Sequence, residues 1–154
     1  MEYQNVVKDF AMRTRENLEI IRRLQRENPD YEVYEVTQLI NSMLGLLIFP
    51  QQRYVNGIPQ TPLAELAEQG WPAPKTRGKF QQVQDLRQLI RYLRNAIAHF
   101  NIEFLSDKNQ QINGLRVWNT FTPRNEPAVK TWEAELSLAD IENITDKFIE
   151  LILQ

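Results

Sequence analysis

Hydrophobic residues recur at helical spacing in three long stretches of the chain. The stretch 2–27 is mostly polar with regularly spaced apolar residues, which predicts an amphipathic helix that ends at Asn28-Pro29, because a residue before proline avoids the α region. The stretch 31–49 becomes apolar on all sides towards its end and predicts a buried helix that is terminated by Pro50. A third helix is predicted over 80–100, with one apolar and one polar face. Its expected apolar arc consists of Leu86, Leu89, Ile90, Leu93, Ala96, Ile97 and Phe100.

The connection 50–80 is rich in proline and glycine. Within it we predict one short helix near 62–69, because Thr61-Pro62 places suitable residues at the cap and in the first turn. A connection of this length is about as often a structural excursion as a functional loop.

Three segments after the third helix have the composition of strands. They are "FNIEFL", "LRVWNTF" and "KTWEAELS", and the stretches between them are rich in turn-forming residues. Ser137 and Asp140 then resemble a capping box at the start of a last amphipathic helix. The pattern predicts a mainly α fold, with a small antiparallel β meander inserted before the C-terminal helix, in a single domain over 1–154.

Composition narrows the choice of function. The chain of 154 residues has a net charge of −2, so any binding of nucleic acid needs a local basic patch. It has no cysteine, which excludes disulfides and thiolate metal sites. The first ten residues do not resemble a signal peptide, and the longest apolar run, 43–49, is much shorter than the roughly 20 residues of a membrane span. We therefore expect a soluble, cytoplasmic protein that does not enter a membrane.

The polar face of the third helix carries the candidate chemistry. It consists of Arg87, Arg91, Arg94, Asn95 and His99, the last being the only histidine in the chain. A histidine can take or give a proton near neutral pH, and an arginine can stabilise charge on a phosphate. RNA supplies its own nucleophile, the 2′-hydroxyl, so this pair is suited to phosphoryl transfer without a metal or another cofactor. A single histidine without acidic partners at ligand spacing predicts no metal site.

Arg94-Asn95-Ala96-Ile97-Ala98-His99 resembles the Arg-X4–6-His motif of the HEPN superfamily. The segments "QLINSMLGLLIFPQQR" and "LIRYLRNAIAHFNIEF", followed by a strand-rich insert and a closing helix, extend the resemblance over most of the chain. The resemblance implies a HEPN-like helical bundle, a homodimer, and a metal-independent endoribonuclease whose site lies in a cleft between protomers. It makes Arg94 and His99 the catalytic pair and Asn95 a supporting polar residue.

One position departs from this family pattern. Some HEPN toxins carry a tyrosine two residues after the histidine, and a partner enzyme modifies it, whereas this chain has Asn101 there. Regulation by that modification therefore does not carry over.

The geometry of an ideal helix also favours a dimer. Arg94 and His99, five steps of about 100° apart, point about 140° away from each other and do not converge on one phosphate. A two-fold partner would complete the site, with Arg87 and Arg91 of both copies adding substrate-binding charge and part of the apolar helix 39–49 sealing the contact.

Two classes of function remain from the sequence. The first is an RNA-cleaving toxin or defence effector, restrained in the cell by an antitoxin or inhibitor protein. The alternative is a non-catalytic HEPN-fold dimer that binds RNA or another protein. The intact Arg94 and His99 favour the first class. A purely structural interpretation is that His99 interacts with the helix dipole while Arg87 and Arg91 form a solvated face.

Overall fold

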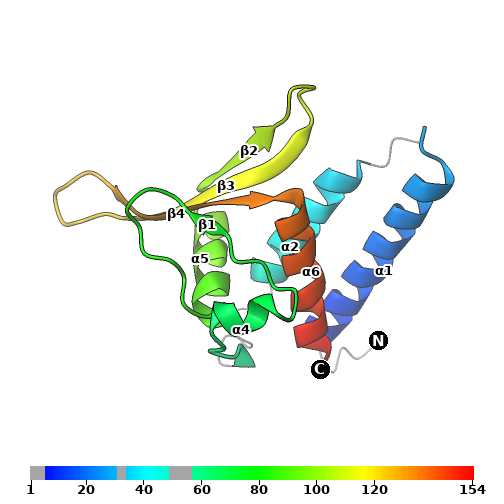
Figure 1. Ribbon diagram of the computed structural model, residues 1–154, viewed down its shortest axis with the longest axis horizontal. Coiled ribbons are helices and arrows are strands. Elements are labelled where there is room, and N and C mark those ends of the chain that lie inside the picture. The colour runs from blue at the N-terminus through cyan, green and yellow to red at the C-terminus, as the bar shows by residue number, and fades with distance from the viewer. Residues whose placement is uncertain (1–5, 31–33, 49–56) are drawn as a thin grey trace.

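The computed structural model describes residues 6–30, 34–48 and 57–154 of the chain. This part contains five α helices and a four-stranded antiparallel sheet (Figure 1). The elements in chain order are α1 (Val6–Glu27), α2 (Glu35–Ile48), α4 (Leu63–Ala67), β1 (Lys75–Thr76), α5 (Leu86–Ala98), β2 (Ile102–Ser106), β3 (Ile112–Phe121), β4 (Val129–Ser137) and α6 (Leu138–Leu153). The predicted helical positions 2–5, 31–33 and 49, and the stop at Pro50, lie outside the described residues.

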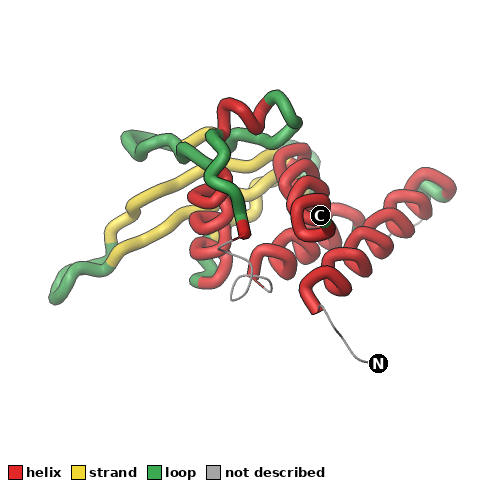
Figure 2. Tube along the Cα trace, turned by 90° about the horizontal axis from the view of Figure 1, so that it is seen from below, coloured by secondary structure: helices red, strands yellow, loops and turns green. Residues whose placement is uncertain are grey.

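The prediction of a mainly α fold is wrong, because the protein has a mixed α/β fold. The three predicted strands are confirmed as β2, β3 and β4, which pair antiparallel in that order, but the sheet has a fourth strand that was not predicted. The sheet has the order β1-β4-β3-β2. The edge strand β1, which comes from the proline-rich connection, therefore lies beside β4. In β1, Lys75 pairs with Glu135 and Thr76 with Ala134. A two-residue strand is too short to show any periodicity, which is why the sequence pattern did not predict it. The ten-residue β3 and nine-residue β4 make the sheet a layer of its own (Figure 2).

Four helices, α5, α6, α2 and α1, pack in successive layers behind one face of the sheet. The helix α5 contacts β3, and α6 contacts both β3 and β4. Behind them α2 contacts α5 and α6, while α1 packs on α2 and α6 (Figure 1). The expectation of a helix buried on several sides holds for the described part of α2, whose buried residues are Leu39, Ile40, Ser42, Met43, Leu46 and Leu47.

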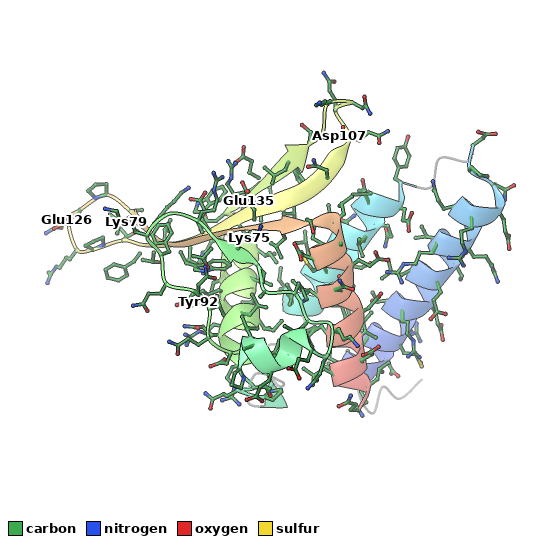
Figure 3. The ribbon with its side chains drawn as sticks, in the orientation of Figure 1. Lys75, Lys79, Tyr92, Asp107, Glu126 and Glu135 are labelled. Atoms are coloured by element: carbon green, nitrogen blue, oxygen red, sulfur yellow. The ribbon has the colours of Figure 1, made fainter. Side chains whose placement is uncertain are left out.

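The two faces of the sheet differ in composition, as expected when alternate residues point to opposite sides. The inner face contributes Leu115, Val117, Trp132, Ala134 and Leu136 to the core. The outer face carries an ion-pair row, in which Arg116 donates to Glu103 at 2.6 Å and to Glu135 at 3.0 Å, while Arg77 donates to Glu135 at 2.6 Å. The hydrogen bond from Arg116 to Glu135 is the main cause that raises the pKa of the Arg116 guanidinium. Figure 3 shows Glu135 above the sheet and Tyr92 of α5 below it.

Local capping explains where the last two helices begin. The predicted capping box is confirmed at α6, where Ser137 Oγ accepts a hydrogen bond from the Asp140 N–H and Asp140 Oδ2 accepts one from the Ser137 N–H. The start predicted for the third helix is wrong, because α5 begins at Leu86 and not at residue 80. Asp85 is its N-cap and accepts a 2.8 Å hydrogen bond from the Gln88 N–H. Residues 80–84 form no helix, and the Gln84 carbonyl instead accepts a hydrogen bond from the Leu63 N–H.

Candidate active site

The helix α5 presents one buried and one polar face, as its sequence predicts. Six of the seven residues of the expected apolar arc are buried, from Leu86 to Ile97. The seventh, Phe100, is 80% exposed, so its predicted place in the core is wrong. The reason is that α5 ends at Ala98, and Phe100 adopts a left-handed φ of 57° that directs the chain away from the helix axis.

A Schellman motif closes α5 and fixes the backbone around His99. His99 is the C-cap residue, and its N–H donates to the Asn95 carbonyl at 3.1 Å. The Phe100 N–H donates to the Ile97 carbonyl at 2.9 Å, and the Asn101 N–H donates to the Ala96 carbonyl at 2.8 Å. The His99 side chain is exposed at this helix end, where solvent or a ligand can reach it.

The guanidinium of Arg94 is half-buried and held by its neighbour. Its Nη1 donates a 2.9 Å hydrogen bond to Asn95 Oδ1. Its Nε is buried and has no hydrogen-bond partner among the described residues. A buried donor without a partner costs about 1–3 kcal/mol of stability. The hydrogen bond to Asn95 therefore orients the Arg94 guanidinium, while its buried Nε is closed to solvent.

The structure places Arg94 and Asn95 near the end of α5 and His99 at its C-cap. Asn95 contacts both other residues, through its side chain to Arg94 and through its backbone carbonyl to the His99 N–H. Within the described ranges no hydrogen bond joins Arg94 directly to His99. Arg94 and His99 are thus two separate groups that suit phosphate chemistry. Arg94 is a cation oriented by Asn95, and His99 is an exposed imidazole.

Comparison with known families gives a match. A family model described as HEPN pEK499 p136 matches residues 1–154. The chain belongs to this HEPN family. This HEPN chain has no match among curated proteins or solved structures. No described helix of the HEPN chain is both long and apolar enough to cross a bilayer.

The two other arginines predicted for substrate binding have different surroundings in this HEPN chain. Arg91 is exposed, and its guanidinium carbon lies 5.7 Å from the centroid of the Tyr92 ring. Arg87 is half-buried, and its Nε donates a 2.8 Å hydrogen bond to the Ile58 carbonyl. Arg91 is therefore open to a ligand, whereas Arg87 ties α5 to the segment that precedes α4.

Sequence reasoning did not single out the residues that hold α5 against the sheet. The rings of Tyr92 and the buried Trp132 pack at 5.2 Å between centroids, and Asn119 Nδ2 donates to the Tyr92 carbonyl at 3.2 Å. These contacts orient the helix, and with it Arg94 and His99, relative to β3 and β4. The only sequence signal was the general expectation that tryptophans fill the core.

Proposed function

We propose that this HEPN chain is a metal-independent endoribonuclease. His99 takes the proton from a 2′-hydroxyl, whose oxygen then attacks the adjacent phosphorus. The bond from phosphorus to the 5′ oxygen breaks, and the imidazolium returns its proton to that oxygen. The products are a 2′,3′-cyclic phosphate and a 5′-hydroxyl, so no water and no outside nucleophile is consumed.

The observation that supports this proposal most directly is the state of Arg94. Its guanidinium is oriented by Asn95 Oδ1, and the residue is only half-buried. A phosphate oxygen accepts hydrogen bonds from guanidinium donors, and negative charge on the phosphoryl oxygens grows during attack. Arg94 is thus suited to stabilising that charge while His99, exposed on the same helix, moves the proton.

The active unit in this proposal is a homodimer. Residues five positions apart on an ideal helix point in different directions, so two copies of the chain would together surround one phosphate. Two exposed Arg91 side chains would add positive charge to the cleft of an otherwise acidic protein. RNA cleavage inside a cell also calls for restraint, so we propose a toxin or defence role with an inhibitory partner protein.

The alternative function is an RNA-binding or protein-binding dimer that does not cleave. The absence of a direct hydrogen bond between Arg94 and His99 in the described structure of one protomer is compatible with it. The two functions differ in one measurable property, which is the dependence of RNA cleavage on the His99 imidazole.

The deciding experiment incubates the pure protein with single-stranded RNA in excess EDTA and analyses the ends of the products. We expect cleavage with cyclic phosphate ends, and a loss of at least about 100-fold in His99→Ala and in Arg94→Ala. Arg15→Ala, which removes an exposed arginine from α1, is the matched control and should cleave at the native rate. Cleavage that requires added divalent metal, or that survives His99→Ala, would falsify the mechanism.

A further inference from the structure

Phe100 presents an aromatic ring to solvent beside the proposed catalytic histidine. Its side chain is 80% exposed, the highest value among the exposed large hydrophobic residues of the described structure. Phe100 directly follows His99, and adjacent Cα atoms lie about 3.8 Å apart. The ring is therefore attached to the backbone next to His99. A large apolar surface in this position is not explained by core packing.

The backbone of Phe100 is also unusual for an aromatic residue. Its φ is 57°, and this left-handed position of a Schellman motif is usually filled by glycine, which has no Cβ to be crowded. The exposed ring gains no burial that would offset the strain. Residues held in such conformations without a structural reward are found preferentially at binding and active sites.

The surrounding hydrogen bonds make the presentation rigid. Phe100 and Asn101 donate to the Ile97 and Ala96 carbonyls, while the Asn101 carbonyl accepts a 3.1 Å hydrogen bond from the Trp118 N–H of β3. The backbone that carries the ring is thus tied to both the helix and the sheet. An exposed aromatic ring on a fixed backbone, with polar neighbours on both sides in the sequence, is a suitable platform for a nucleic-acid base, because every base has a π-face.

We propose that the Phe100 ring stacks on an unpaired RNA base next to the scissile phosphate, which makes Phe100 a substrate-positioning residue. The place of this contact in the reaction rests on the proposed ribonuclease function. Stacking on a side chain requires a base that is free to leave its own stack, so the substrate is single-stranded at that nucleotide. The ring then fixes the nucleotide whose 2′-hydroxyl or phosphate meets His99.

A second copy of the chain is the competing partner for this ring. A stable protein interface buries about 800 Å² on each side and has an apolar centre. Phe100 is instead flanked in sequence by His99 and Asn101, whose side chains offer hydrogen bonds. A base, with an apolar face and polar edges, fits such a setting better than an apolar dimer contact does.

The test uses three substitutions of Phe100 and one matched control. Phe100→Trp keeps an aromatic ring, Phe100→Leu keeps only apolar bulk, and Phe100→Gly removes the side chain and suits the left-handed φ. The control is Tyr34→Leu, because Tyr34 is also aromatic, 70% exposed and left-handed with a φ of 45°, but lies between α1 and α2. The probe is a short single-stranded RNA containing 2-aminopurine, whose fluorescence falls when it stacks.

We expect Phe100→Leu and Phe100→Gly to raise KM, and the Kd measured in a His99→Ala background, by roughly 5- to 100-fold, the range for loss of one stacked base. Native protein, Phe100→Trp and Tyr34→Leu should quench the 2-aminopurine, and Phe100→Leu should not. The midpoint of thermal unfolding of Phe100→Gly should be no lower than that of the native protein, so the loss of binding is not a loss of fold.

The possible failures separate the two proposals. If the native protein cleaves RNA and Phe100→Leu binds, quenches and cleaves equally well, the stacking proposal is overturned while the ribonuclease stands. If the native protein cleaves nothing but Phe100→Leu still weakens RNA binding and quenching, stacking stands and the catalytic proposal fails. If Phe100→Gly dissociates the dimer in sedimentation while Phe100→Leu retains native RNA affinity, the ring belongs to a protein interface and the stacking proposal is wrong.

Discussion

Arg94 Nη1 donates a 2.9 Å hydrogen bond to the side-chain oxygen of Asn95, its immediate neighbour in the sequence. Asn95 therefore has two functions in α5, since its backbone carbonyl also accepts the hydrogen bond from the His99 N–H that caps the helix. The orientation of the cation and the end of the helix depend on the same residue. Further tests can therefore address Asn95 as well as the proposed catalytic pair.

Replacing the Asn95 side chain should affect the proposed RNA cleavage without removing Arg94 or His99. In Asn95→Leu the Arg94 guanidinium loses its acceptor, and a hydrogen bond to a charged group is worth about 1.5–3 kcal/mol, so we expect kcat to fall roughly 10- to 100-fold. Asn95→Asp keeps an acceptor but places a negative charge near the phosphate, and should mainly raise KM. Steady-state kinetics of the two variants measures this split. Identical kcat values for native protein and Asn95→Leu would show that Arg94 needs no support from Asn95.

Arg94→Met should stabilise the protein while it abolishes cleavage. Methionine has a similar length but no buried donor, so the cost of the Nε that lacks a partner among the described residues is removed. We expect the free energy of unfolding in urea to rise by about 1 kcal/mol and the cleavage rate to fall at least about 100-fold. Arg15→Met on α1 is the control for replacing an arginine. A drop in stability would mean that the Arg94 side chain is mainly a structural group.

Arg91 should act through charge and not through a specific contact. Its exposed guanidinium, packed near the Tyr92 ring, is suited to a phosphate of the bound strand. For Arg91→Ala we expect weaker RNA binding and a slope of log Kd against log salt that is shallower by about 0.7 for each lost phosphate contact. Fluorescence anisotropy with labelled single-stranded RNA at several salt concentrations measures that slope. An unchanged slope would remove Arg91 from the binding surface.

The outer face of the sheet predicts a dependence of stability on pH. The hydrogen bond from Lys130 is the main cause that lowers the pKa of Glu133 below its ordinary value of 4.5. A carboxyl whose pKa is lowered by folding stabilises the folded state above its unfolded pKa, and this contribution is lost as the pH falls through the folded pKa. Glu133→Gln should therefore unfold at a lower temperature than native protein at pH 7, with the difference shrinking below pH 4.5. A difference that stays constant between pH 7 and pH 3 would contradict this assignment.

The features that were predictable from sequence are those with a local pattern. The buried arc of α5 from Leu86 to Ile97 follows from helical spacing, and the capping box of α6 follows from Ser137 and Asp140, three residues apart. The predicted place of Phe100 in the apolar arc was wrong, because a helical wheel assumes that the helix continues. The Schellman motif instead turns the chain at that point. The strand β1 was not predicted, because Lys75 and Thr76 form a strand only through pairing with the distant β4.

The candidate site was predictable in composition but not in its contacts. The resemblance implied only that Asn95 is a supporting polar residue, whereas the structure shows that its side chain contacts Arg94 and its carbonyl accepts from the His99 N–H. The engagement of Arg87 by Ile58 depends on a segment 29 residues away and has no local signal. The assignment of Arg94 and His99 as a catalytic pair remains a prediction that the cleavage assay tests.

The junction between α5 and β2 has a thermodynamic consequence for the proposed reaction. Only His99, Phe100 and Asn101 separate α5 from β2, and hydrogen bonds to α5 and from β3 fix this short junction. Ordering the backbone of one residue costs about 1–2 kcal/mol in conformational entropy. That cost arises once, when the chain folds, and not at each encounter with RNA. The junction is thus preorganised, so binding energy from the rest of the strand can be used to orient the phosphate.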